Sequence, residues 1–241
     1  MVHSRTTTFV LTLLVAPLAA LFVSACGGGG GNELPLIRAY FRASNVADRG
    51  SLANIAMYSW NARERGAVTN PSIDSVSEVG IRPLRVKEFA DGLSDAQAEE
   101  ETFTEEKIAF QDENFDAINR VLEAERDGED VASRDSELQD AWTDWRTRTM
   151  EHSKMVSDAR QELTNEQNDA SLSVFNPNNQ PDLTQFDGEV RTKDVQITAS
   201  VELDGSESEE TMTVTLQQTV LAGAGEDGEP LEGRWVIANI S

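Results

Sequence analysis

The amino-acid sequence predicts an α+β fold, in which an N-terminal helix pair covers a curved antiparallel sheet and a long antiparallel helical hairpin is inserted after the first strand. Three patterns support this prediction. Apolar residues recur at helical spacing near the start, alternate with polar residues near the end, and step by three and four residues through the middle. We therefore expect residues 34–93 and 171–241 to form one α+β domain, and residues 94–170 to form the hairpin.

The first predicted elements are two helices between Leu34 and Trp60. Asp48-Arg49-Gly50-Ser51 interrupts the helical pattern, and Ser51 is of a residue type that caps helix N-termini. Each helix should turn one face inward: Ile37, Tyr40, Phe41 and Ser44 in the first, and Leu52, Ile55 and Ala56 in the second.

A strand is predicted next, from Ile73 to Phe89. Val79 and Ile81 share one face, and Leu84 and Val86 keep the period of two. Pro83 has no amide hydrogen to donate to a neighbouring strand. The strand should therefore lie at a sheet edge or break at this residue.

The predicted hairpin begins at Ser94-Asp95-Ala96-Gln97, which fits a capping box. Its first helix should end at Asp127-Gly128. The apolar seam of this helix is predicted at seven-residue intervals, at Ile108, Phe115 and Leu122 with Ile118 beside them.

The second hairpin helix is predicted to start at a further capping box, Ser136-Glu137-Leu138-Gln139. Its largely apolar seam steps by four and three residues alternately, which is typical of a coiled coil. The seam residues are Leu138, Trp142, Trp145, Thr149, His152, Val156, Ala159 and Leu163.

Trp142, Trp145 and His152 form the candidate partner interface within this seam. Aromatic side chains often supply the binding energy of protein contacts, and a histidine can act as a pH switch. The alternative is a packing role, in which the tryptophans fill the hairpin core against Phe115 and Ile118 and His152 is packed beside them.

The C-terminal part is predicted to form a three-strand antiparallel meander. An Asp204-Gly205 turn separates the first two strands, and a turn from Gly223 to Pro230 separates the second from the third. The residues predicted to face inward are Val195, Ile197, Ala199, Val201 and Leu203, then Met212, Val214 and Leu216, and then residues of the last strand, Trp235 to Ile240.

Residues 1–25 have the pattern of a signal peptide. Arg5 precedes an apolar stretch from Phe9 to Val23 that is short for a membrane span. Val23-Ser24-Ala25-Cys26 then resembles the lipobox of bacterial lipoproteins. The alternative is an ordinary secretory signal in which the cysteine is incidental.

The lipoprotein resemblance implies that Cys26 becomes the acylated N-terminus of the mature chain and anchors it to a membrane. Residues 26–33 are expected to form the lipidated end and a glycine-rich tether. Gly27 is not the aspartate that retains enteric lipoproteins at the inner membrane. The implied location is the cell envelope, at the outer membrane, facing the periplasm or the cell surface.

Composition excludes several classes of function. The formal charge of −23 argues against nucleic acid as a partner, and predicts that the folded part stands off anionic lipid. Cys26 is the only cysteine, and His152 is the only histidine after the signal peptide. We therefore expect no disulfide, no metal site and no cofactor, and acidic clusters such as Glu207 to Glu210 lack calcium-loop spacing.

The ends of the chain resemble the nuclear transport factor 2-like, or ketosteroid isomerase-like, superfamily. Leu36 to Met57 resembles its opening helix pair, with Tyr40-Phe41, Asp48 and Leu52-Ala53, and Gly233-Arg234-Trp235-Val236-Ile237 resembles its closing strand. The hairpin is a large departure from that family. An unrelated α+β lipoprotein domain is the alternative.

This second resemblance implies a conical pocket, which in some members holds a catalytic aspartate. Tyr40 and Tyr58 are the available hydroxyl donors, but they and Asp48 fit structural roles, so no catalytic residue is named. The sequence therefore favours a non-catalytic binding or scaffolding role with an envelope protein partner. A small-ligand binder or isomerase-like enzyme, and a purely structural envelope protein, are the alternatives.

Overall fold

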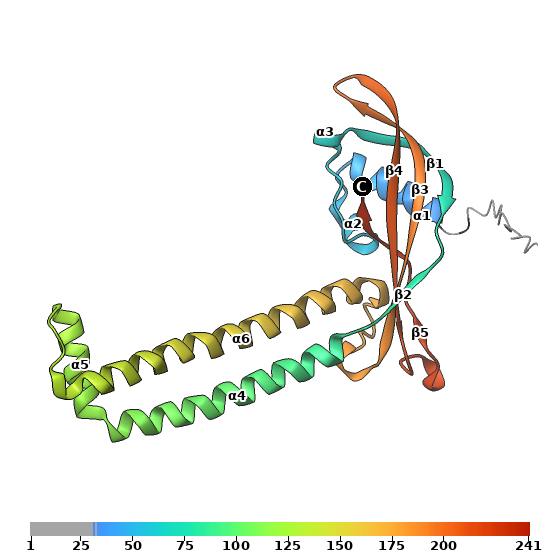
Figure 1. Ribbon diagram of the computed structural model, residues 1–241. Helices are drawn as coiled ribbons and strands as arrows, with labels where there is room; N and C mark the ends of the chain where they lie inside the picture. Colours follow the sequence, from blue (N-terminus) through green and yellow to red (C-terminus); the bar gives the residue numbers. More distant parts are fainter. Residues whose placement is uncertain (1–30, 32) are drawn as a thin grey trace, which may run out of the picture. The chain divides into compact units, whose positions relative to one another are not determined.

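The computed structural model describes residues 31 and 33–241 and has the predicted α+β class, with a curled antiparallel sheet, a layer of helices and a long helical hairpin (Figure 1). The signal peptide, Cys26 and most of the tether lie outside the described residues. The α-helices are α1 (Glu33–Asn45), α2 (Arg49–Ile55), α3 (Ala62–Arg65), α4 (Val86–Glu113), α5 (Phe115–Asp127) and α6 (Ser136–Val174), and the 3₁₀ helices are η1 (Ser133–Asp135), η2 (Leu183–Gln185) and η3 (Glu226–Gly228).

The sheet is built on one long ribbon made of two antiparallel strands. These strands, β3 and β4, pair from Gly188–Leu221 at one end to Leu203–Ser206 at the other, and the predicted turn joins them. β1 and β2 both pair with β3, while β5 and β6 both pair with β4, so the predicted meander is confirmed. The strands are β1 (Ala67–Val76), β2 (Gly80–Pro83), β3 (Gly188–Leu203), β4 (Ser206–Leu221), β5 (Leu231–Glu232) and β6 (Val236–Ile240).

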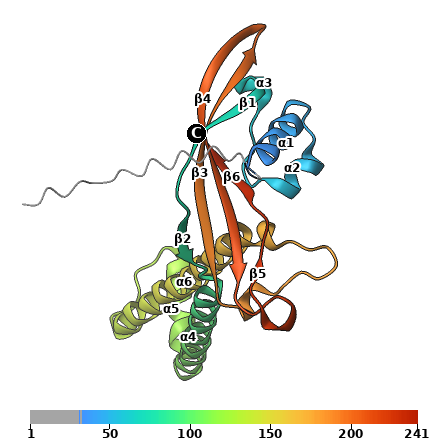
Figure 2. The ribbon, with the colours of Figure 1, turned by 90° about the vertical axis from the view of Figure 1, so that its right-hand side faces the viewer.

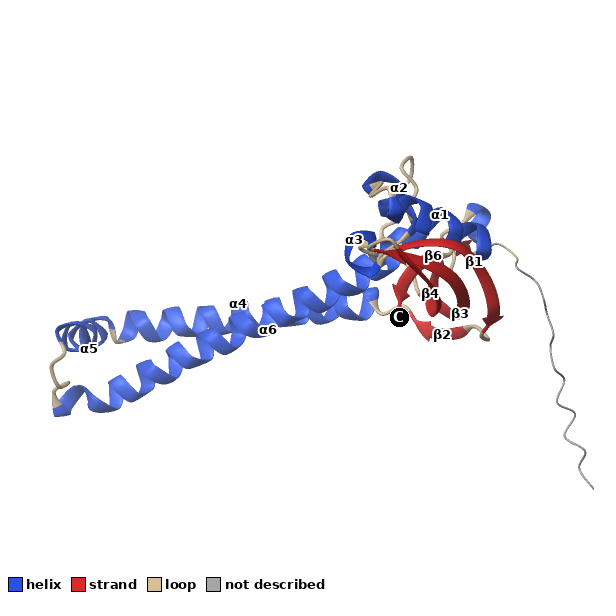
Figure 3. Cartoon of the chain, turned by 90° about the horizontal axis from the view of Figure 1, so that it is seen from above, coloured by secondary structure: helices blue, strands red, loops and turns tan. Residues whose placement is uncertain are grey.

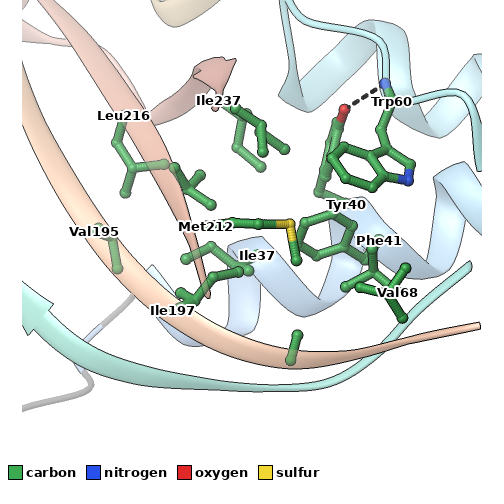
Figure 4. Packing of buried hydrophobic residues seen from close by; sticks show 14 residues of the cluster. Ile37, Tyr40, Phe41, Trp60, Val68, Val195, Ile197, Met212, Leu216 and Ile237 are labelled. Atoms are coloured by element: carbon green, nitrogen blue, oxygen red, sulfur yellow. Dashed lines mark hydrogen bonds between the residues drawn. The ribbon is translucent and has the colours of Figure 1, made fainter. Parts of the chain in front are cut away.

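One face of the ribbon is covered by α1, as the sequence predicts. All four residues of the predicted inward face of α1 are buried. Phe41 packs edge-on against Tyr40 and Trp60, with ring centroids 5.2 and 5.9 Å apart. Figure 4 shows the side chain of Met212 of the sheet reaching these rings, with Ile197 of the sheet beside Ile37 in the same cluster. The Tyr40 hydroxyl accepts a hydrogen bond from the Trp60 amide (2.8 Å) and donates one to the Tyr58 carbonyl (3.2 Å).

The N-terminus of α2 is capped by Asp48, which confirms the structural role expected of that residue, and not by Ser51, the other predicted cap. The Asp48 carboxylate accepts hydrogen bonds from the Ser51 amide (3.1 Å) and hydroxyl (2.6 Å). These bonds hold the pKa of Asp48 below its ordinary value. Asp48 precedes the first turn and is therefore placed to accept from an amide three residues later, whereas Ser51 lies inside that turn.

A second buried cluster lies on the opposite face of the ribbon. Val190 is five positions before Val195, and side chains alternate between the two faces of a strand, so the Val190 side chain points to the other side of the sheet. Val190 and Leu221 pack there against Val86 at the start of α4 and Ala170 near the end of α6. Figure 2 shows α1 and α2 beside one part of the ribbon and the hairpin base beside another.

The segment that we predicted as one strand, Ile73 to Phe89, forms three elements. It contains the end of β1, all of β2 and the start of α4. Pro83 is the last residue of β2, which agrees with the predicted break. Val86 begins a helix because a carboxylate from α6, that of Glu166, accepts the Arg85 amide (3.0 Å), a partner that local sequence does not reveal.

An ion pair fastens the beginning of α1 to β3. The Lys193 ammonium donates to the Glu33 carboxylate (2.5 Å) and lies 4.1 Å from the centre of the Trp235 ring. The side chains of Lys193 and Glu33 are only 10% and 16% exposed. The hydrogen bond from Lys193 holds the pKa of Glu33 below its ordinary value of 4.5.

This ion pair predicts a pH-dependent contribution to stability. A carboxylate whose pKa is lower in the folded state stabilises the fold above its unfolded pKa, and the contribution is lost as pH falls through the folded pKa. Glu33→Gln is therefore expected to reduce the free energy of unfolding by about 1–2 kcal/mol at neutral pH. Urea denaturation should show this difference shrinking below the ordinary pKa of 4.5. A difference that is the same at all pH values would contradict the pairing.

Candidate binding site on the helical hairpin

The hairpin consists of α4 and α6 lying side by side, with α5 between them in sequence and at their outer end (Figure 3). Gly128 ends α5 in the left-handed conformation (φ 70°), as the predicted helix end at Asp127-Gly128 requires. Neither capping box is formed. Ser94 lies inside α4, and Ser136 begins α6 but donates its hydroxyl to the Ser133 carbonyl (3.0 Å).

The predicted seam of α6 is confirmed, because all eight of its residues are buried or half-buried. The predicted seam of the first helix is wrong at its three heptad positions, although Ile118 beside them is buried. Ile108, Phe115 and Leu122 are 51%, 63% and 40% exposed, and Asn114 separates α4 from α5. The residues of α4 that face α6 are Ala96, Phe103 and Phe110, again seven apart, alternating with the polar residues Glu100 and Lys107.

Trp142, Trp145 and His152 lie between the two long helices. Trp142 is 7% exposed, whereas Trp145 and His152 are half-buried. Trp145 packs on Phe103 and Phe110 with ring centroids 5.2 and 5.5 Å apart, and His152 stacks on Phe103 at 4.3 Å. The three residues therefore lie in the hairpin core, and the ring partners of Trp145 and His152 are in α4 and not at Phe115 as we expected.

Polar contacts across the seam set the register of the helices. The Lys107 ammonium donates to the Thr149 hydroxyl (2.8 Å), and the Ser153 hydroxyl donates to Glu100 (3.2 Å). The Arg148 guanidinium covers the Phe103 and Trp145 rings, at 4.9 and 4.7 Å from their centroids. A sliding of one helix along the other would break these pairs together.

Charged pairs hold α5 and its loop at the outer end. Arg146 of α6 donates two hydrogen bonds to Glu125 (2.9 and 3.0 Å), which lower the pKa of that carboxyl group. Arg120 of α5 donates two to Asp135 (3.0 and 2.7 Å), which likewise lower the pKa of Asp135. Both carboxylates are therefore negatively charged at neutral pH.

The base of the hairpin is bonded to β4 through the last turns of α6. Gln217 donates its amide to the Asp169 carbonyl (2.7 Å), and the Ser173 hydroxyl both donates to the Arg234 carbonyl (2.7 Å) and accepts from the Thr219 amide (2.8 Å). Burial, with Glu166 adding to it, raises the pKa of the Asp169 carboxyl group. These contacts fasten the hairpin at one end.

Exposed apolar side chains occur along the rest of the hairpin. We call Ile108, Phe115, Leu122 and Met150 the distal surface, because they lie on α4, α5 and α6 away from that base (Figure 1). Ile108 also borders a groove of about 240 Å³ between α4 and α6, which His152 and Lys107 line as well. Large apolar side chains are therefore exposed to solvent on all three helices of the hairpin.

The space that an isomerase-like pocket would occupy is filled by side chains. Between α1 and the sheet lies the cluster that contains Tyr40, Phe41 and Trp60. Beside it, a recess of about 90 Å³ is bordered by Glu33, Lys193, Leu216 and Trp235. Burial raises the pKa of Tyr40, whose hydroxyl is already engaged by backbone groups.

Within residues 31 and 33–241, no group of three or more metal-ligating side chains comes together, and no helix is long and apolar enough to cross a membrane. Comparisons with protein-family models, with curated proteins and with solved structures found no match to this chain. The resemblances to lipoproteins and to the nuclear transport factor 2-like superfamily therefore stay predictions.

Proposed function

We propose that this protein is a bacterial lipoprotein whose helical hairpin binds a protein partner in a non-catalytic, scaffolding role. In this proposal acylated Cys26 holds the chain on the cell-envelope membrane, at the outer membrane facing the periplasm or the cell surface. The observation that carries the binding role is the distal surface, where Phe115 and Met150 are 63% and 67% exposed on a hairpin that is fastened to the sheet at its base.

The chemistry of the distal surface defines the kind of partner. Phe115 is flanked in sequence by Asp112, Glu113 and Asp116, all of which are exposed. A partner should therefore present apolar side chains surrounded by basic ones, because buried apolar contact and opposite charge act together at such surfaces. The filled interior beneath α1 gives no comparable support to a small-ligand or isomerase-like activity.

Capture of a partner from the native envelope tests the binding role. Chemical crosslinking followed by purification of the lipidated chain should recover a specific protein. The double variant Phe115→Glu, Met150→Glu should lose it, with unchanged far-ultraviolet circular dichroism because both side chains are exposed. The matched control Leu203→Glu changes another exposed apolar residue, outside the hairpin, and should keep the partner. Retention by the double variant would refute the distal surface.

The anchor has a separate test. Cys26→Ala should abolish incorporation of labelled palmitate, because Cys26 is the only cysteine in the chain. It should also release the protein from the membrane fraction, since anchoring depends on the acyl chains. A membrane-bound, acylated Cys26→Ala variant would contradict the lipoprotein assignment without bearing on the hairpin.

A further inference from the structure

Positive charge is concentrated in the N-terminal helices of this acidic protein. Residues 31–66 contain five of the 20 basic residues of the chain but only three of its 43 acidic ones. One of those three, Glu33, is paired with Lys193. This part of the chain therefore has a net positive charge on a molecule whose formal charge is −23. The five basic residues are Arg38, Arg42, Arg49, Arg63 and Arg65.

Two of these arginines form a row along the outer side of α1. Arg38 and Arg42 are four residues apart and are therefore neighbours on one side of α1, and Val46 directly follows the end of this helix at Asn45. All three are exposed, and Val46 is 72% exposed. We call these three residues the arginine row.

The arginines of this row have no carboxylate within ion-pair distance among the described residues, although the chain has more than twice as many acidic as basic residues. Elsewhere, arginines such as Arg82 and Arg146 are paired with glutamates. Two neighbouring guanidinium groups without a counter-charge repel each other and attract an external anion.

A groove lies beside the row, between α1 and β1. Its volume is about 430 Å³, and its lining includes both arginines but no acidic side chain. Asn45 braces the wall: its amide donates to the Val68 carbonyl (2.8 Å), and its oxygen accepts the Val68 amide (3.1 Å). The guanidinium groups are therefore presented on a helix that is fixed to the sheet.

The proposed anchor limits how far this surface can be from a membrane. Cys26 and Glu33 are seven residues apart, and seven residues span at most about 25 Å whatever their conformation. Arg38 and Arg42 lie in the second and third turns of α1, which begins at Glu33. An acylated Cys26 would thus keep both arginines within reach of lipid headgroups.

We infer that the arginine row binds the phosphate groups of anionic lipids in the membrane that holds Cys26. The inference rests on the proposed lipid anchor, and it differs for α1 from the expectation that the whole folded part stands off anionic lipid. The guanidinium groups of Arg38 and Arg42 bind phosphate oxygens, and Val46 reaches the boundary of the acyl chains. The rest of the chain is strongly acidic and is repelled, so the same field turns α1 toward the membrane.

The test uses the lipidated full chain in vesicles. With Cys26 acylated, Ala39→Cys supplies the only free thiol, at an exposed position next to Arg38, and a fluorophore on it reports contact with the surface. In vesicles of two parts phosphatidylcholine to one part phosphatidylglycerol, the uncharged quencher acrylamide should quench the fluorophore much less than in pure phosphatidylcholine. The ratio that matters is that of chains with α1 on the membrane surface to chains with α1 away from it. Each arginine near an anionic surface changes this ratio about fivefold, so Arg38→Gln with Arg42→Gln should lower it about 25-fold.

Controls separate the explanations. Arg160→Gln removes an exposed arginine of α6 that has no ion pair among the described residues and should leave the protection unchanged. Equal quenching in both vesicle types would overturn the inference, as would full protection in the double arginine variant. A response to inorganic phosphate alone, without dependence on vesicle charge, would overturn it in favour of a free-anion site. Failure of the chain to float with either vesicle type would instead refute the anchor.

Discussion

Phe103→Ala is expected to unfold the outer part of the hairpin while the sheet and α1 stay folded. Phe103 is 4% exposed and contacts the rings of Trp145 and His152 as well as Arg148. Removing a buried phenylalanine ring costs about 3–5 kcal/mol. Beyond its base the hairpin is held by this seam, and helices without tertiary packing are marginally stable in water.

Far-ultraviolet circular dichroism and hydrogen exchange check this prediction. The variant should lose helical signal, and the amides of α4 and α6 near Phe103 should lose protection, while those of β3 and β4 keep theirs. Phe115→Ala is the matched control. Phe115 is 63% exposed, so its removal should change the free energy of unfolding by less than about 0.5 kcal/mol. Equal loss of protection in the sheet would show that the hairpin and the sheet unfold as one unit.

Phe41→Ala is expected to destabilise the α+β part as a whole. Phe41 is 1% exposed and lies edge-on to Tyr40 and Trp60 in the main core, so its loss should cost about 3–5 kcal/mol. A domain of ordinary stability has about 5–15 kcal/mol in total. The urea midpoint should therefore fall sharply, and β3 and β4 should lose protection together with α1.

The matched control for this variant is Phe175→Ala, because Phe175 is 44% exposed at the end of α6. Its urea midpoint should stay close to that of the unchanged chain. A midpoint for Phe41→Ala equal to that of the control would mean that α1 contributes little to the stability of the sheet.

The elements predicted correctly are those whose periodicity is nearly complete. The inward face of α1 is buried as expected, and so is that of β3 from Val195 to Val201. Leu203, at the end of β3, was also predicted to face inward but is 38% exposed. The seam of α6 contains two polar residues, Thr149 and His152, but its spacing of three and four residues is still clear. In such segments local sequence and tertiary packing favour the same structure.

The seam of α4 could not be recognised in the same way. Its inward positions alternate apolar residues with Glu100 and Lys107, which bond to Ser153 and Thr149 of the other helix. Ile108, Phe115 and Leu122 form a more apolar pattern, and we therefore predicted that they face inward, yet they are exposed. Polar contacts between distant segments decide which face of α4 turns inward, and such contacts leave no local pattern.

The start of α4 was missed for the same physical reason. Glu166, which is 81 residues from Arg85 in the chain, accepts the amide of Arg85 (3.0 Å) and pairs with Arg82 (2.6 Å). A capping residue that comes from a distant part of the chain cannot be recognised from the residues next to the helix start in sequence. In the candidate site, the spacing of α6 correctly predicted that Trp142, Trp145 and His152 lie in the seam. The exposure of Phe115 was not predicted, because the sequence did not reveal that α4 ends at Glu113 and α5 begins at Phe115.

Site-specific photocrosslinking in the native envelope tests the central claim, that the hairpin binds a protein partner, most directly. A photoreactive residue would replace Phe115 or Met150 on the distal surface and, as a control, Ser208 on the exposed end of β4. We predict that both hairpin positions crosslink to the same protein and that Ser208 does not. Crosslinks from Ser208 but not from either hairpin position, or no protein crosslinks from any of the three, would contradict the assignment of the hairpin as the binding element.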